Sequence, residues 1–297
     1  MQKAAPNDAR GRIREIQADP CNQWIPRAAE AGKVVEGLHV MHNGLRVHPM
    51  GRFYLDALAQ NRGCHEPQEE YLFQEALKFI PAGGTMLELG AYWAFYSLWF
   101  AARVPDARCY MVEPDPTNLE VGKRNFEANG RQGRFFCDKV GRDRLKVDQF
   151  LDEQRIEQLD LLHADVQCAE LEMLEGAEAS LSGRRIGYVF LSTHGQDLHY
   201  RCLEVLRSHG YVIVAHADWY DGTYCQDGVI VARAPHLVGL QPLALPLRAP
   251  HRPYAIGSSD ETWETQMAQL AAYRGPLRNA VRWVKQFVGD ALKRSRD

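Results

Sequence analysis

The sequence predicts an α/β fold built on a Rossmann-like, mostly parallel sheet of seven strands. Short apolar runs alternate with longer amphipathic or apolar segments from residue 85 to residue 234. The first run ends in a glycine, Gly90, and the second ends in an acid, Glu113. Strands that alternate with crossover helices pair in parallel, with right-handed connections. We therefore expect one doubly wound sheet in the middle of the chain.

The N-terminal part, residues 1–66, is expected to form an extension in front of this sheet. Residues 1–36 are polar and irregular, and we expect no more than a short helix near 27–36. An Asn43-Gly44 pair between two alternating runs predicts a β-hairpin over 34–48. Its histidines are interpreted as exposed strand residues rather than metal ligands: His39, His42 and His48.

The central domain, residues 67–234, holds the predicted sheet. Strands are expected at 85–89, 108–112, 134–140, 159–166, 186–193, 211–217 and 228–234. Helices are expected at 67–80, 92–104, 119–129, 147–156, 169–181 and 199–209. The run at 186–193 is almost entirely apolar, which predicts a strand buried on both faces.

Residues that bind a ligand are expected at the carboxyl ends of the parallel strands. Gly90 lies in the first strand-to-helix turn, where a missing side chain lets the backbone approach a ligand. Glu113 ends the second strand, where an acid can accept hydrogen bonds from both hydroxyls of a ribose. The turn at 88–97 has no basic residue and no GxGxxG motif, which disfavours a dinucleotide. An adenosyl ligand without phosphate fits better, and S-adenosylmethionine is the common one.

Two segments resemble motifs of the FkbM-type methyltransferase family. The first is ELGAYWAFYS at 88–97, which is similar to the family pattern acid-x-Gly-Ala-Asn-x-Gly-x-x-Ser. The second is LDLLHADVQCAELEMLEGA at 159–177, which is similar to a DLLKIDVEGAELEVLEGA-like segment. The chain departs from these patterns where the family usually has Asn, Gly, Glu and Gly, at Tyr92, Ala94, Gln167 and Cys168.

The resemblance covers roughly residues 66–234 and implies a methyltransferase sheet whose last strand is antiparallel. It implies binding of S-adenosylmethionine, with the helix at 67–80 lying over the cofactor. The cofactor-binding residues expected from it and from the strand ends are Glu88, Gly90, Ala91, Tyr92, Glu113, Pro114, Val140 and Asp165. Acceptors in the resembled family are hydroxyls of sugars, glycans and natural products, so we expect an O-methyltransferase with a small-molecule or glycan substrate.

The candidate catalytic residues lie at the ends of the fourth and fifth strands. His163 and Asp165 share one face of their strand, and His194 follows the next strand. A histidine is well suited to take the proton of an acceptor hydroxyl at neutral pH, with Asp165 orienting it. Alternatively, Asp165 and His194 hold a divalent metal that lowers the pKa of the hydroxyl, although Mg²⁺ prefers oxygen ligands. Asp165 alone could instead cap the helix that follows it.

Two other functions remain alternatives to an active methyltransferase. One is a catalytically inactive S-adenosylmethionine-binding protein, suggested by Tyr92 and Ala94. The polar residues at the strand ends argue against it, because an inactive site does not need them. The other is a different Rossmann enzyme, such as a nicotinamide oxidoreductase, and the missing glycines count against it.

Composition sets further limits on class and location. The 297 residues are 25% charged and 45% hydrophobic, with a net charge of −3, so no strong positive field recruits nucleic acid. Seven cysteines without a CxxC pair favour a reducing cytoplasm and disfavour a zinc site. The N-terminus has no apolar signal-peptide region, and no run of about 18 apolar residues predicts a membrane span.

The C-terminal part, residues 235–297, is expected to hold an extended arm and a helix. Residues 235–260 are rich in proline, which predicts an extended segment. Residues 276–296 form a basic amphipathic pattern. We favour docking of this helix on its own domain or on a second subunit, as in a homo-oligomer, over contact with an anionic membrane surface.

Overall fold

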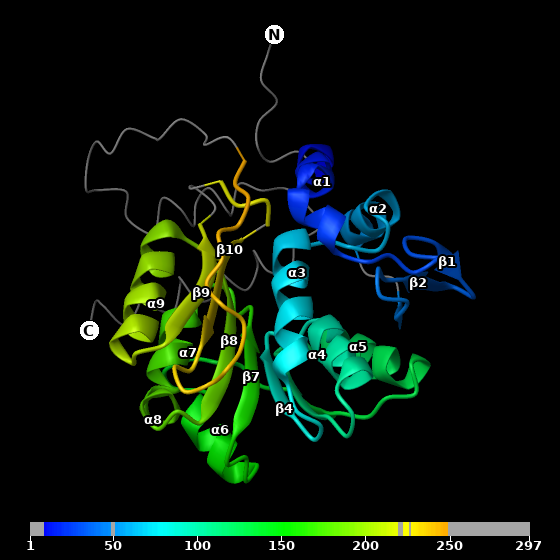
Figure 1. Ribbon diagram of the computed structural model, residues 1–297. Helices are drawn as coiled ribbons and strands as arrows, with labels where there is room; N and C mark the ends of the chain where they lie inside the picture. Colours follow the sequence, from blue (N-terminus) through cyan, green and yellow to red (C-terminus); the bar gives the residue numbers. More distant parts are fainter. Residues whose placement is uncertain (1–8, 49–50, 219–221, 226, 249–297) are drawn as a thin grey trace, which may run out of the picture.

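The computed structural model describes residues 9–48, 51–218, 222–225 and 227–248 (Figure 1). The helix expected at 276–296 lies outside these residues. Within them, no helix is long and apolar enough to cross a membrane.

A seven-stranded sheet forms the centre of the fold, with the strand order β6-β5-β4-β7-β8-β10-β9. The strands from β4 to β8 pair in parallel, whereas β10 pairs antiparallel with both β8 and β9. This arrangement confirms the predicted fold class, including the antiparallel last strand. The strand bounds are β4 Thr85–Leu89, β5 Arg108–Val112, β6 Arg134–Phe136, β7 Leu159–Ala164, β8 Ile186–Thr193, β9 Val212–Ala217 and β10 Gly228–Arg233.

Helices cover both faces of this sheet (Figure 1). One face packs on α3 Pro67–Ala76, α4 Phe95–Arg103 and α5 Pro116–Ala128, and α3 continues into the short η2 Leu77–Phe79. The other face packs on α6 Val147–Glu153, α7 Glu170–Glu175, α8 Glu178–Ser182 and α9 Gln196–Ser208. Side chains alternate along each strand, so in β4 Met86 faces the first layer while Leu87 and Leu89 face the second.

Several predicted elements are shorter in the structure. The helix expected from residue 92 begins at Phe95, because Tyr92 and Ala94 have φ angles of 48° and 59°, outside the helical region. The strand expected over 134–140 ends at Phe136. The single helix expected over 169–181 is two short helices, α7 and α8, which are separated at Gly176.

The chain before α3 contains α1 Ala9–Ala18, η1 Pro20–Trp24, β1 Val34–Val35, β2 Leu38–Val40, β3 Arg46–Val47 and α2 Arg52–Gln60. The predicted hairpin is confirmed by β2 and β3, which pair antiparallel around Asn43-Gly44. The helix expected near 27–36 is wrong, since β1 lies there. Helix α1 was not predicted, and it forms because Ile13 and Ile16 bury against Ala57 of α2.

The hairpin is docked on the sheet domain through buried polar contacts. Asn125 of α5 accepts a hydrogen bond from the backbone N–H of His48 at 2.7 Å. His42 is buried rather than exposed, and its Nε2 lies 3.1 Å from Oε2 of Glu70 in α3. His39 is buried as well. The expectation of exposed histidines was wrong at these two positions because the hairpin packs against α3, α4 and α5.

Residues 235–248 form no helix or strand and run back across the molecule. The side chain of Gln68 in α3 donates to the carbonyl of Pro246 at 2.5 Å and accepts from the hydroxyl of Thr223 at 2.6 Å. Arg248 donates to the carbonyl of Thr223. Residues 235–248 and the loop before β10 therefore both contact the buried side chain of Gln68.

Candidate functional site

The turn after β4 presses directly on the end of β7. Gly90 has a φ of 71°, and a Cβ on this residue would lie 1.8 Å from the carbonyl oxygen of Asp165. The N–H groups of Gly90 and Ala91 donate to the carbonyl of Val112 at 2.9 and 3.0 Å. The carboxyl ends of β4, β5 and β7 are therefore joined by close backbone contacts.

Glu113 lies at the end of β5, as predicted, and is nearly buried. Its carboxylate accepts hydrogen bonds from the N–H of Tyr92 at 2.9 Å, the N–H of Asp115 at 3.0 Å and the side chain of Asn118 at 3.3 Å. Burial raises the pKa of Glu113. The carboxylate thus holds the β4 turn in place, and its contact with a ribose stays a prediction.

Glu88 of β4 is buried, and its side chain reaches the start of α4. Its carboxylate accepts a hydrogen bond from the N–H of Ser97 at 3.0 Å, and burial raises its pKa. This bond satisfies one of the free N–H groups in the first turn of the helix. A direct contact of Glu88 with the cofactor stays a prediction.

The structure brings Asp165 and His194 together, as expected from the adjacency of β7 and β8. Oδ1 of Asp165 lies 3.3 Å from Nε2 of His194. A third residue, Asp227, places its Oδ1 3.7 Å from the same nitrogen. One side-chain donor atom from each of the three lies within 4.8 Å of the others. We call Asp165, His194 and Asp227 the three-residue cluster.

Two further residues fix the imidazole of His194. Glu170 is fully buried, and its Oε1 accepts a short hydrogen bond from Nδ1 of His194. Nε2 of Gln167 lies 3.0 Å from Nε2 of His194 and 3.3 Å from Oδ1 of Asp165. Glu170 at Nδ1 therefore leaves Nε2 as the ring nitrogen that faces the two aspartates.

The charges of this cluster interact strongly. Burial lowers the pKa of His194, but the negative charges of Asp227, Glu170 and Asp165 have a larger effect in the opposite direction. The pKa of His194 is therefore raised well above its ordinary value. Burial and Asp227 raise the pKa of Asp165 to about 7, although His194 acts in the opposite direction.

His163 lies in a different environment from His194. Its Nε2 lies 2.7 Å from Oε1 of Glu69 in α3, and its ring stacks on Tyr96 with centroids 4.2 Å apart. Burial lowers its pKa. Among the described residues, no hydrogen bond or ion pair joins it to His194. Its position indicates a role in the packing of α3 on the sheet, and the predicted catalytic role gains no support.

The residues that the sequence reasoning missed are Asp227, Glu170 and Gln167. Gln167 and Glu170 lie inside the segment at 159–177 whose resemblance to the family was noted. Asp227 directly precedes β10, and the antiparallel pairing of Gly228 with Thr193 of β8 brings it beside His194. The Asp-Gly pair at a strand start was the only local signal for it.

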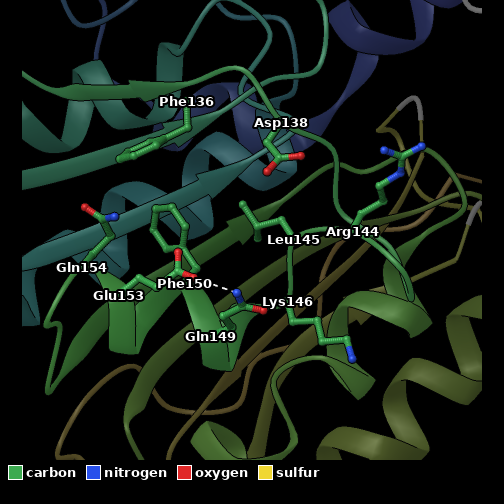
Figure 2. A pocket seen from close by; sticks show the side chains of 9 residues that line it. All are labelled: Phe136, Asp138, Arg144, Leu145, Lys146, Gln149, Phe150, Glu153 and Gln154. Atoms are coloured by element: carbon green, nitrogen blue, oxygen red, sulfur yellow. Dashed lines mark hydrogen bonds between the residues drawn. The ribbon is translucent and has the colours of Figure 1, made fainter.

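Val140 lies in the loop after β6, where it forms a bridge with Leu145, and is buried. A cavity of about 270 Å³ lies nearby, between the edge strand β6 and α6 (Figure 2). It is lined by Phe136, Asp138, Arg144, Leu145, Lys146, Gln149, Phe150, Glu153 and Gln154. Neither Val140 nor the three-residue cluster lines it, and the contact of Val140 with an adenine stays a prediction.

The chain was compared with protein families, curated proteins and solved structures. Residues 138–213 match the model of the methyltransferase FkbM domain. This segment runs from the loop after β6 into β9 and includes Asp165, Glu170 and His194. A search of the curated proteins finds no match.

Solved structures similar to this chain include several methyltransferases. Ribosomal protein L11 methylase from Lactobacillus delbrueckii subsp. bulgaricus is 11% identical, with a TM-score of 0.43 over 64% of this chain and 83% of the other. Precorrin-6y C5,15-methyltransferase from Geobacter metallireducens is 18% identical, with a TM-score of 0.40 over 54% and 84%. Fibrillarin from Aeropyrum pernix, in complex with S-adenosyl-L-methionine, is 18% identical, with a TM-score of 0.38 over 54% and 74%.

The domain match confirms the resemblance seen in the two sequence motifs, and it falls on the part of the sheet that carries Asp165 and His194. Residues 138–213 are therefore similar to the FkbM-type methyltransferase domain, and they lie in a sheet with the strand order β6-β5-β4-β7-β8-β10-β9.

Proposed function

We propose that this methyltransferase transfers the methyl group of S-adenosylmethionine to a hydroxyl of a sugar, glycan or natural product. The observation that carries the proposal is the 3.3 Å contact of Asp165 with His194 beside the Gly90 turn. Oxygen methylation requires a group next to the methyl donor that either accepts the hydroxyl proton or lowers the pKa of the hydroxyl. A histidine held between carboxylates at the strand ends supplies such a group.

The cofactor is proposed to lie across the turn at Gly90, Ala91 and Tyr92. Glu113 would accept hydrogen bonds from the ribose, and Val140 would contact the adenine. The close approach of Gly90 to the carbonyl of Asp165 supports this placement, because it makes the cofactor turn a neighbour of the acceptor residues. Pro114, Glu88 and Asp165 complete the proposed binding set.

In the transfer step the acceptor oxygen attacks the methyl carbon. The new C–O bond forms as the C–S bond breaks, and S-adenosylhomocysteine leaves. The hydroxyl proton must go elsewhere, and Nε2 of His194 faces the aspartates while Glu170 holds Nδ1. As a base, the neutral form of His194 takes the proton at Nε2 and Glu170 stabilises the imidazolium that results, as for a histidine oriented by a carboxylate. Because the pKa of His194 is raised, this neutral form is favoured only at higher pH. As a metal ligand, Nε2 would instead hold a cation that lowers the pKa of the hydroxyl.

A second candidate is a protein that binds S-adenosylmethionine without catalysis. It is favoured by Tyr92 and Ala94, which replace the usual Asn and Gly of the family motif at positions with positive φ. Cofactor binding without transfer to any acceptor would support it.

Two measurements test the proposed function. Calorimetric titration with S-adenosylhomocysteine tests the cofactor site, and absence of binding at high micromolar concentration contradicts it. Transfer of a labelled methyl group to a panel of glycosides and polyhydroxylated natural products tests the chemistry. We expect His194→Ala to lower the rate about 10²-fold or more while cofactor affinity stays intact. Asp197→Asn, on the exposed start of α9, is the control. Label recovered only on nitrogen or carbon would refute oxygen methylation.

A further inference from the structure

We infer that the three-residue cluster, Asp165, His194 and Asp227, is a binding site for a divalent metal cation, and that Glu170 is the positioning residue that orients His194 toward it. The inference rests on the proposed function in one respect: the cation would hold the acceptor hydroxyl beside the cofactor.

The three donor atoms have the spacing that one cation requires. Small divalent ions lie about 2.0–2.2 Å from oxygen and nitrogen donors, so two donors on one ion lie about 3–4 Å apart. The distances from Nε2 of His194 to the two aspartates are 3.3 and 3.7 Å. All three donor atoms lie within 4.8 Å of one another, so a small shortening of the distances between them would let all three bind one cation.

The donors lie at the ends of three neighbouring strands of one sheet. Asp165 follows β7, His194 follows β8, and Asp227 precedes the antiparallel β10. Side chains at such ends converge without large loop movements. Each donor is therefore the residue next to a strand end.

Glu170 gives the site the arrangement that is typical of a metal-bound histidine. A ligating histidine usually donates its second ring N–H to a carboxylate, which fixes the tautomer and the ring orientation. Glu170 is fully buried and accepts that hydrogen bond from Nδ1 of His194. Nε2 then faces Asp165 and Asp227, and a cation bound there would replace its proton.

The charge balance points to the same ligand. Three carboxyl groups surround one imidazole, so the acidic groups outnumber the basic group by two. The second oxygen of Glu170, Oε2, is buried without a hydrogen-bond partner in the described part of the chain. Buried negative charge without a partner is costly, and a divalent cation in the cluster would offset it.

The donor set indicates which cation fits. Two carboxylates and one imidazole suit Mn²⁺, which accepts oxygen ligands together with a nitrogen, better than they suit Mg²⁺. The side chain of Gln167 lies 3.0 Å from Nε2 of His194. Rotation of its amide would present an oxygen as a fourth ligand, because amide orientation follows the hydrogen bonds available.

The test is a Mn²⁺ titration of the full chain after removal of metal with EDTA, followed by electron paramagnetic resonance of the free ion. We expect saturable binding of one Mn²⁺ per chain. Asp227→Asn and His194→Ala should each weaken it at least tenfold. Glu170→Gln should weaken it about 10–100-fold, as expected for a residue that orients a ligand. The control, Asp197→Asn, removes an acid from the same side of the sheet and should bind Mn²⁺ normally.

Each variant is first checked for folding by circular dichroism and for S-adenosylhomocysteine binding. The inference is overturned if the folded parent protein shows no saturable binding at millimolar Mn²⁺. It is equally overturned if Asp227→Asn and His194→Ala both bind with the parent affinity.

The outcome also separates this inference from the proposed function. Methyl transfer to a hydroxyl by metal-free protein, with no Mn²⁺ binding, leaves the proposed function standing with His194 as base and removes the metal site. Mn²⁺ binding that requires the cluster, without transfer to any hydroxyl, keeps the site and removes the proposed reaction.

Discussion

Replacing Gly90 with alanine should destabilise the protein and displace Asp165. A Cβ at Gly90 would lie 1.8 Å from the carbonyl oxygen of Asp165 and 2.8 Å from its carbonyl carbon. Both atoms belong to the backbone, so no side-chain rotation can relieve the contact. The turn after β4 and the end of β7 would have to separate until the contact reaches 3.0 Å or more.

The structure allows the size of this effect to be worked out. The φ of 71° costs an alanine roughly 1–2 kcal/mol. Separation of the two chain segments also weakens the bond from Gly90 N–H to the carbonyl of Val112 and the bond from Asp165 N–H to the carbonyl of Leu89. Each is worth about 0.5–1.5 kcal/mol. We therefore expect a loss of about 2–5 kcal/mol in the free energy of unfolding.

Urea unfolding of Gly90→Ala measures this loss, and Gly83→Ala is the matched control. Gly83 has a φ of 76°, but nothing lies within 4 Å of a Cβ built there. It should therefore show the backbone penalty alone, about 1–2 kcal/mol. Titration with S-adenosylhomocysteine should show weakened binding for Gly90→Ala only. Equal losses of stability in the two variants, with cofactor binding intact in both, would refute the close contact on which this reasoning depends.

Three further changes test other parts of the site. Ala94→Gly should raise the free energy of unfolding by about 0.5–1 kcal/mol in urea, because it relieves a φ of 59°, and a loss would contradict that backbone conformation. Glu113→Ala should weaken calorimetric binding of S-adenosylhomocysteine by about 1–3 kcal/mol, whereas Glu120→Ala on α5 should not change it. Burial raises the pKa of Glu69 from 4.5 to about 7, so the folded state holds this proton more tightly and its contribution to stability is lost as the pH rises through 7. In Glu69→Gln, the free energy of unfolding measured in urea should therefore change less between pH 5 and 8 than in the parent protein. An unchanged dependence on pH would show that Glu69 is ionised beside His163.

The sequence was sufficient to predict most of the sheet. Strands β4, β5 and β8 begin and end at the predicted residues, because each is a short apolar run bounded by glycine, proline or charged residues. Helix starts were less predictable. The apolar pattern over 92–104 is helical throughout, but the positive φ of Tyr92 and Ala94 delays the helix to Phe95. A periodic pattern of apolar residues does not reveal such a constraint.

Two of the three residues of the cluster could be predicted from the adjacency of strands alone. Asp165 and His194 were expected to meet because consecutive parallel strands usually lie side by side. Asp227 could not be placed in this way, since its position depends on β10 entering the sheet between β8 and β9. Glu170 depends on a turn at Gln167 and Cys168, whose φ angles are 47° and 70°.

The four departures from the family motifs share one structural property. Tyr92, Ala94, Gln167 and Cys168 all have positive φ. Non-glycine residues in this region cost of order 1–3 kcal/mol each where the surroundings hold them, and such residues cluster at functional sites. Two of them precede α4 and two precede α7, so both turns that meet at the Gly90–Asp165 contact carry backbone strain.

A buried carboxylate holds each of these strained turns. Glu113 accepts the N–H of Tyr92 at 2.9 Å, and Glu170 accepts the N–H of Cys168 at 3.2 Å. We also propose that Glu113 binds the ribose and that Glu170 orients His194. Removing either one should therefore relax a turn as well as remove a ligand contact, because the same oxygen atoms stabilise the backbone. Isosteric glutamine variants are thus more informative than alanine variants at both positions, since a glutamine side chain still offers an oxygen to the N–H of the turn.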